Sequence, residues 1–358
     1  MKKIVFVTNH FQYGDGVSKV LLELVNSLEP NKYDITIKVL FKSDNEFAKN
    51  LNQNIKLEKV FNYYFRGMTR LVQILPQKIL YKMIIREKYD VEVAFQFGAP
   101  TKIMAYSTNK LSKHICWMHG YDSNMEMLKY YNMYDKVICV SKSTKEKLEK
   151  YIDNPDKVDY LYNIVNDKII KEKACEDIDI EKKYRFTFCT VGRLSKEKGF
   201  LRLLKCHKKL IDEGLEQNLI IVGEGPEKET LQQYIQENNL NKSVILTGLQ
   251  VNPYKYINKS DIFVCSSFSE GFSTACTEAV ILKKPVISTL VDGAKELIDS
   301  NGCGIVVDNN EEELYNAMKM ALKDQKVINT WKKASYLQSK NLTLENRVIK
   351  VEEFFDNL

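Results

Sequence analysis

A loop in the second half of the chain carries cations that suit the binding of a diphosphate. The apolar run RFTFCTVG is followed by Arg193, Lys198 and Gly199, and then by the helical pattern FLRLLKCHKKL. The dipole of a helix makes its N-terminus locally positive, so cations there are disfavoured unless an anion lies between them. Arg193 offers a forked donor and Lys198 a point charge, which together fit a diphosphate. A solvated basic turn is the alternative.

A second loop carries two glutamates. The apolar run DIFVCSS leads to Glu270 and then to a segment that is apolar on nearly every side and contains Glu278. A buried carboxylate needs a polar partner, and the paired hydroxyls of a ribose fit Glu278, with an internal salt bridge as the alternative. Glu270 follows the strand, where it accepts hydrogen bonds from a sugar or remains a solvated carboxylate. The start of the helix, Gly271, Phe272, Ser273 and Thr274, offers backbone amides to phosphate oxygens.

The first half of the chain contributes a glycine loop and a histidine. The run KIVFVT is followed by Gly14-Asp15-Gly16, and two glycines let a backbone approach a phosphate closely. The third glycine of a dinucleotide fingerprint would fall at Lys19 and is missing, so NAD and FAD are disfavoured. His119 follows the run KHICWM and is a further candidate, since ligands gather at the carboxyl ends of parallel strands. A purely structural histidine is the alternative.

These loops need a parallel sheet to position them, and the sequence predicts two. Short apolar, β-branched runs alternate with helical patterns in residues 1–166 and again in 185–340, which is typical of doubly wound α/β domains in tandem. The charged stretch 167–184 is predicted as a linker, and the chain after Asp308 as helical.

The motifs VGRLSKEKG and EGFSTACTE, in this order and spacing, resemble those of the retaining nucleotide-sugar glycosyltransferases of family 4, which have the GT-B fold. GDG, WMHG and VGEGP followed by LTGLQ extend the resemblance over nearly the whole chain. It implies two Rossmann-like domains that face a central cleft, with a last helix, about 341–358, crossing back to the first domain.

The resemblance also assigns roles. Arg193 and Lys198 would hold the diphosphate of a UDP-sugar, Glu278 the ribose and Glu270 the donor sugar. Gly16 would close over the phosphates, His119 would touch the sugar near the reacting carbon, and the backbone near Leu249 would contact the base. It implies retention of configuration by a front-face route in which the leaving phosphate takes the acceptor's proton.

No metal is expected to take part. The leaving diphosphate is neutralised by Arg193, Lys198 and helix amides, so the mechanism requires no divalent ion and no other cofactor. The DxD sequence Asp177-Ile-Asp179 falls in the predicted linker and not at a strand end, which argues against a metal site there. The eight cysteines are scattered without CxxC spacing and are expected to be reduced.

Charge is concentrated in one segment of the first half. Residues 1–166 hold 25 basic and 18 acidic side chains, and residues 56–89 alone hold eight basic and two acidic ones among aromatic and aliphatic residues. This mixture favours an anionic membrane surface, although two ordinary surface helices interrupted at Pro76 are the alternative. No nucleic-acid motif accompanies the charge, so nucleic acid is not expected as a partner.

The resemblance therefore implies an enzyme that transfers a hexose or N-acetylhexosamine from a UDP-sugar to a saccharide acceptor, and the basic segment favours a lipid-linked acceptor. A cytoplasmic location is expected, peripheral at the inner face of the cell membrane, since neither a secretory signal nor an apolar span of about 20 residues is seen. The alternatives are a protein or soluble glycan acceptor, a non-catalytic nucleotide-sugar-binding partner, or another two-domain enzyme such as an epimerase or a phosphorylase.

Overall fold

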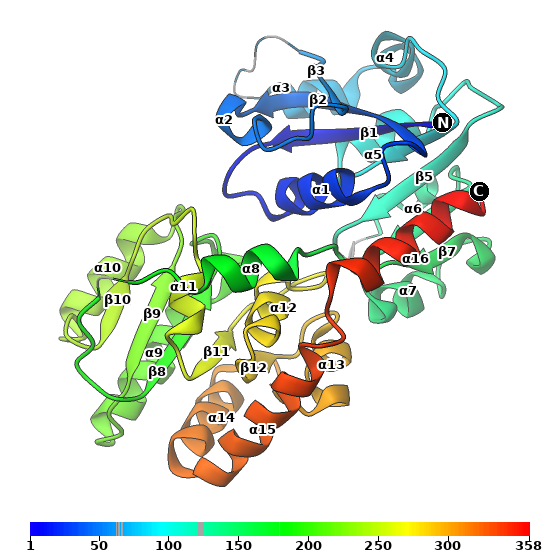
Figure 1. Ribbon diagram of the computed structural model, residues 1–358. Helices are drawn as coiled ribbons and strands as arrows, with labels where there is room; N and C mark the ends of the chain where they lie inside the picture. Colours follow the sequence, from blue (N-terminus) through cyan, green and yellow to red (C-terminus); the bar gives the residue numbers. More distant parts are fainter. Residues whose placement is uncertain (62, 64, 66, 121–124, 179) are drawn as a thin grey trace. The chain divides into compact units, whose positions relative to one another are not determined.

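The computed structural model describes residues 1–61, 63, 65, 67–120, 125–178 and 180–358. The chain divides into two compact units (Figure 1). Unit 1 comprises Met1–Ile164 and Arg347–Leu358, and unit 2 comprises Val165–Asn346. The stretch predicted as a linker begins with a helix, α8 (Asp167–Lys173), and is part of unit 2.

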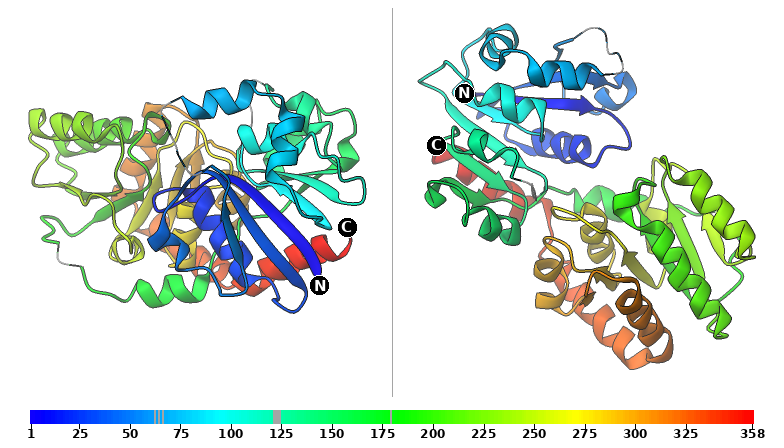
Figure 2. Two further views of the ribbon diagram at one scale, coloured as in Figure 1. Left: turned by 90° about the horizontal axis from the view of Figure 1, so that it is seen from above. Right: turned by 180° about the vertical axis from the view of Figure 1, so that it is seen from behind.

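Unit 1 is built on a parallel sheet of seven strands in the order β3-β2-β1-β4-β5-β6-β7. The central strands are buried along almost their whole length, as expected for a sheet covered by helices on both faces (Figure 2). The strands are β1 (Lys2–Phe11), β2 (Tyr33–Ser43), β3 (Lys56–Lys59), β4 (Val91–Ala94), β5 (Lys113–Met118), β6 (Lys136–Cys139) and β7 (Val158–Tyr160).

The edge strand β3 was not predicted. Its sequence, KLEK, lacks the apolar run by which the other strands were found, and its side chains are exposed or half-buried. Pairing with β2 supplies the backbone hydrogen bonds that the sequence pattern does not indicate.

The helices of unit 1 connect the strands. They are α1 (Gly16–Ser27), α2 (Asn45–Ala48), α3 (Met68–Ile74), α4 (Gln77–Ile84), α5 (Ala99–Met104), α6 (Leu128–Tyr131) and α7 (Lys142–Leu148), with the 3-10 turn η1 (Pro155–Lys157). The last helix, α16 (Leu344–Asp356), returns to this unit as predicted: Phe355 packs edge-on against Phe6, and Tyr33 donates a hydrogen bond to Asp356 at 2.7 Å.

Unit 2 has a parallel sheet of six strands in the order β10-β9-β8-β11-β12-β13. The strands are β8 (Thr187–Val191), β9 (Asn218–Val222), β10 (Val244–Leu246), β11 (Ile262–Cys265), β12 (Val286–Thr289) and β13 (Gly304–Val307). The order reverses between β8 and β11, and ligands of doubly wound sheets bind where the strand order reverses.

The helices of unit 2 complete a second Rossmann-like domain. Besides α8 they are α9 (Phe200–Asp212), α10 (Lys228–Glu237), α11 (Tyr254–Asn258), α12 (Thr274–Ile281), α13 (Ala294–Leu297), α14 (Glu311–Lys323) and α15 (Gln325–Gln338), with the 3-10 turns η2 (Lys196–Lys198) and η3 (Asp299–Asn301). The predicted α/β fold with two Rossmann-like domains is thus confirmed. No helix of the described residues is long and apolar enough to cross a bilayer.

Candidate functional site

The loop after β8 holds the predicted diphosphate-binding cations. Lys198 closes the 3-10 turn η2, and Gly199 connects it to α9 with a φ of +65°. A Cβ at Gly199 would lie 2.2 Å from the carbonyl oxygen of Ser266, so only glycine lets this turn approach the loop after β11. Arg193 is exposed, and its guanidinium makes no hydrogen bond or ion pair with the described residues.

The structure brings Lys198 and Glu270 together from two different loops. The Lys198 ammonium lies 2.6 Å from Oε1 of Glu270, and the Ser267 hydroxyl donates to the same oxygen at 2.6 Å. The side chains are 26% and 13% exposed, so this ion pair is partly shielded from water. Burial lowers the pKa of Lys198, but the charge and the hydrogen bond of Glu270 more than offset it, and the pKa lies above its ordinary value. The lysine is therefore a cation at neutral pH.

Arg202 was not predicted as a site residue. Its side chain links the start of α9, just after the loop that carries Lys198, to the loop after β11. From the first turn of α9 its guanidinium donates to the carbonyl oxygens of Ser266 and Ser267, each at 2.7 Å, and to Oδ1 of Asn309 at 2.8 Å. The guanidinium also lies 3.9 Å from the centre of the Phe268 ring. Arg202 is buried, although arginine is rarely buried without partners. The sequence did contain an indication that Arg202 is buried, since it stands among the leucines of FLRLL on the face of α9 that packs against the core of the unit.

The helix that carries Glu278 begins two residues later than predicted. The sequence places the helix start at Phe272, whereas α12 begins at Thr274 with Ser273 as its N-cap, whose hydroxyl accepts the amide of Cys276. Phe272 is buried against Gly293, where a Cβ would lie 2.4 Å from the ring. Glu278 lies within α12 and is 2% exposed, as its apolar surroundings predict. The roles of Gly271, Phe272, Ser273, Thr274 and Glu278 toward a ligand remain predictions.

The loop after β10 joins the same edge of the sheet. The Gly223 amide donates to the Gly248 carbonyl at 2.9 Å, and a Cβ at Gly223 would lie 1.8 Å from the Gly192 carbonyl oxygen. The loops after β8, β9 and β10 are thus held in contact through their backbones. Leu249, predicted near the base, is exposed directly after Gly248.

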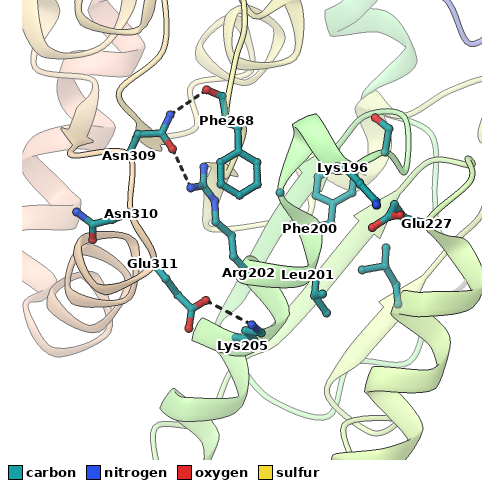
Figure 3. Close-up of a pocket in the computed structure, with 13 residues that line it drawn as sticks. Lys196, Phe200, Leu201, Arg202, Lys205, Glu227, Phe268, Asn309, Asn310 and Glu311 are labelled. Carbon is teal, nitrogen blue, oxygen red and sulfur yellow. Dashed lines mark hydrogen bonds and ion pairs between the residues drawn. The ribbon is translucent and has the colours of Figure 1, made fainter.

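A pocket of about 430 Å³ borders these loops (Figure 3). Its wall includes Lys196 and Gly199 from the loop after β8, Phe268 from the loop after β11, and Asn309. The amide of Asn309 bridges Arg202 and the Phe268 carbonyl, at 2.8 and 3.1 Å. Sequence reasoning did not indicate this pocket, because its wall combines residues from four separate segments, 195–205, 227–231, 268 and 309–311.

The two candidates of the first half lie in unit 1. Gly16 is the first residue of α1, where the side chain of Asp15 caps the amides of Val17 and Ser18. His119 follows β5, with its ring 4.5 Å from that of Phe95. Burial lowers the pKa of His119 to about 3, against the opposing effects of hydrogen bonds to Asn163 and to the Phe95 backbone. His119 is therefore a neutral imidazole at physiological pH.

The described residues of unit 2 can thus neutralise an anion with Arg193 and Lys198 and accept hydrogen bonds at Glu270. Over the described parts of the chain, no group of three or more His, Cys, Asp or Glu side chains is arranged to hold a metal ion. Asp179 of the DxD sequence lies outside the described residues.

Comparison with known proteins assigns the family. The family model described as Glycosyltransferase Family 4 matches residues 14–168, and the model described as Glycosyl transferases group 1 matches residues 172–338. A curated relative from Campylobacter jejuni is 30% identical over 262 residues, which are 71% of this chain and 70% of the relative. The chain belongs to the family 4 glycosyltransferases of the GT-B fold. The predicted family is therefore correct, and the enzyme is a transferase of sugars.

The names of the relatives describe related reactions. The Campylobacter jejuni protein is an N-acetylgalactosamine-N,N'-diacetylbacillosaminyl-diphospho-undecaprenol 4-alpha-N-acetylgalactosaminyltransferase. A second relative, the Escherichia coli UDP-Gal:alpha-D-GlcNAc-diphosphoundecaprenol alpha-1,3-galactosyltransferase, is 24% identical over 95% of this glycosyltransferase and 93% of its own length. Among solved structures, Anabaena Alr3699/HepE in complex with UDP and glucose has a TM-score of 0.77 over the whole of both chains at 16% identity, which supports the fold alone.

Proposed function

We propose that this glycosyltransferase moves a hexose or N-acetylhexosamine from a UDP-sugar to a lipid-linked saccharide, in the synthesis of a cell-surface polysaccharide or glycoconjugate. Both named relatives act on saccharides carried by diphospho-undecaprenol, which supports the acceptor part. The proposal of a UDP-sugar donor rests on the ion pair between Lys198 and Glu270, which lies where the strand order of the unit 2 sheet reverses. Ligands of doubly wound sheets bind at this position.

The cations of this site suit a departing nucleoside diphosphate. Breaking the bond to the anomeric carbon develops negative charge on the leaving phosphate, and preorganised donors stabilise such charge without further rearrangement. The Lys198 ammonium has three donors, of which the Glu270 contact uses one. Arg193 is exposed in the same loop, and its guanidinium can donate to two phosphate oxygens at once. In this proposal no divalent ion is needed.

Glu270 is proposed to bind the donor sugar. Its Oε1 accepts from Lys198 and Ser267, which fixes the carboxylate in place and leaves acceptor capacity for sugar hydroxyls. Glu278 is proposed to bind the ribose. His119 is proposed to contact a sugar hydroxyl, for which its neutral imidazole offers one donor and one acceptor. Retention of configuration is proposed from the family resemblance, with the leaving phosphate accepting the proton of the acceptor hydroxyl.

The experiment that tests the proposal measures UDP release. The enzyme is incubated with UDP-glucose, UDP-galactose, UDP-N-acetylglucosamine and UDP-N-acetylgalactosamine, each with and without a short polyprenyl-diphosphate saccharide. We expect slow release from one donor alone and much faster release with the lipid-linked acceptor, unchanged by EDTA. Release from no UDP-sugar would refute the donor assignment, and acceleration only by a water-soluble glycan or a protein would refute the acceptor assignment.

A further inference from the structure

Two neighbouring helices of unit 1, α3 and α4, carry large apolar side chains on their solvent-exposed faces. The inner face of α4 carries Leu80, Tyr81 and Ile84, which belong to the core of the unit. Its outer face carries Ile79 and Met83, which are one helical turn apart and are 59% and 52% exposed. A surface helix of a soluble domain normally has charged or polar residues there.

The preceding helix repeats the pattern. In α3 the side chains of Met68 and Val72 are buried in the core, whereas Leu71 and Ile74 are exposed, Ile74 to 79%, and Leu75 at the C-cap is exposed as well. Exposed apolar side chains that occur singly are normal, but a contiguous group of this kind marks an interaction surface.

Cations accompany the apolar side chains. Lys78 and Lys82 are one turn apart on the outer side of α4, and Arg70 is exposed on α3. Between Glu58 and Glu87 the sequence holds six Lys and Arg residues and no Asp or Glu. Lys78, Lys82 and Arg70 make no ion pair with a carboxylate of the described residues, so their charge is available to a partner. Arg66, which belongs to the same run, lies outside the described residues.

The two helices are firmly attached to the unit. The Tyr81 hydroxyl donates to the buried carboxylate of Glu92 at 2.9 Å, and the Ser107 hydroxyl donates to Tyr81 at 2.8 Å. At the corner between the helices, the Gln77 side chain donates to the Val72 and Leu75 carbonyl oxygens. The exposed apolar and cationic side chains are therefore carried by two helices that are fixed to the core of the unit; Figure 1 shows the position of α3 and α4 in the chain.

We infer that α3, α4 and their connection, residues 67–86, form a surface that docks unit 1 on an anionic phospholipid bilayer. Exposed Leu, Ile and Met side chains bordered by Lys and Arg match the boundary between acyl chains and anionic headgroups. Residues 67–86 contain no Asp or Glu, so no carboxylate in this stretch would be repelled by the anionic headgroups. The inference deepens the proposed function, since it would bring the enzyme to a lipid-linked acceptor, but it is testable without donor or acceptor.

Vesicle sedimentation tests the surface directly. The full chain is centrifuged with vesicles of phosphatidylglycerol and phosphatidylcholine, and with phosphatidylcholine alone, at low and high salt. We expect binding to the anionic vesicles that falls with salt. The double variant Lys78→Gln/Lys82→Gln should bind about 30-fold more weakly, since each cation near an anionic surface contributes about 1 kcal/mol. The matched control Lys142→Gln/Lys147→Gln, which removes two exposed cations from α7, should bind like the wild type.

A second measurement distinguishes insertion from electrostatic adsorption. Ile79→Trp places an indole on the outer face of α4, and Leu111→Trp places one at a side chain that is 88% exposed elsewhere in unit 1. Brominated lipids should quench the fluorescence of Trp at position 79, which would enter the bilayer, and not that of Trp at position 111. The two native tryptophans are buried, so they should add little quenching to either variant. The inference would be overturned if both tryptophans were quenched equally or if the two charge variants bound the vesicles equally well. It would also be overturned if the wild type failed to sediment, or if the protein dimerised through this surface without binding vesicles.

Discussion

Replacing Lys198 by methionine should separate the structural from the catalytic contribution of the lysine. The variant keeps most of the apolar stem but removes the ammonium that lies 2.6 Å from Glu270. Among the described residues, the Ser267 hydroxyl is the other hydrogen-bond donor to the Glu270 carboxylate. The variant should therefore lose both the ion pair in the free enzyme and the charge that stabilises the leaving diphosphate.

The exposure of the two side chains sets the expected magnitude. Breaking a fully buried ion pair costs about 3–5 kcal/mol, and an exposed one contributes about 0–1 kcal/mol. At 26% and 13% exposure the pair lies between these limits, so Lys198→Met should lower the free energy of unfolding by about 1–3 kcal/mol. Loss of one preorganised donor should lower turnover by about 10²- to 10³-fold.

The assay is a double-mutant cycle with two readouts. Urea unfolding and UDP release are measured for the wild type, Lys198→Met, Glu270→Gln and the double variant. Since the double variant leaves no unpaired charge, it should regain part of the lost stability but none of the lost turnover. The control is Lys208→Met/Asp212→Asn, which removes a more exposed i,i+4 ion pair at 2.5 Å from α9, the helix that follows Gly199. It should change unfolding by under about 1 kcal/mol and leave turnover nearly unchanged.

Two results would refute this reasoning. If Lys198→Met turned over UDP-sugar at the wild-type rate, the lysine would not stabilise the leaving group. If the double variant recovered turnover together with stability, the role of Lys198 would be to hold the loop and not to bind the diphosphate.

Three further predictions follow from single residues. Gly199→Ala should destabilise unit 2 by about 2–4 kcal/mol in urea, because strain at positive φ adds to the clash with Ser266, whereas Gly214→Ala, at φ +78° with open space around it, should lose only about 1–2 kcal/mol. Burial lowers the pKa of His207 to about 3, so the stability it contributes is present above its unfolded pKa near 6.5 and is lost as the pH falls toward 3; His207→Gln should flatten this dependence by up to about 1.4 kcal/mol per pH unit. Arg193→Ala should lower turnover by about 10²- to 10³-fold with little change in unfolding, since the side chain is exposed.

The sequence was sufficient for the parts of the fold in which burial dictates residue type. The inner strands of the two sheets, such as β1, β4, β8 and β11, are apolar and rich in β-branched residues, because strands covered on both faces must be apolar. The edge strand β3 was not predicted, because its sequence KLEK is largely exposed and has no apolar run. It forms a strand through its pairing with β2.

The candidate site was predicted less completely, because sequence reasoning treats each loop separately. Lys198 and Glu270 were each assigned to a strand end and to a different part of the ligand, but their direct contact depends on the packing of two loops 72 residues apart. Arg202 was missed for a related reason. Its partners are backbone carbonyl oxygens, which any residue type provides, so no side-chain pattern indicates them.

Isothermal titration of the full chain with UDP, GDP and ADP tests most directly whether unit 2 binds a nucleoside diphosphate as proposed. We expect UDP to bind without added metal and, at a hundredfold excess over its dissociation constant, to stabilise the protein against unfolding by about 2.7 kcal/mol. Arg193→Ala should weaken this binding, and EDTA should leave it unchanged. If none of the three nucleotides bound, or if binding appeared only with Mg²⁺ or Mn²⁺, the proposed metal-independent nucleotide-sugar site would be wrong.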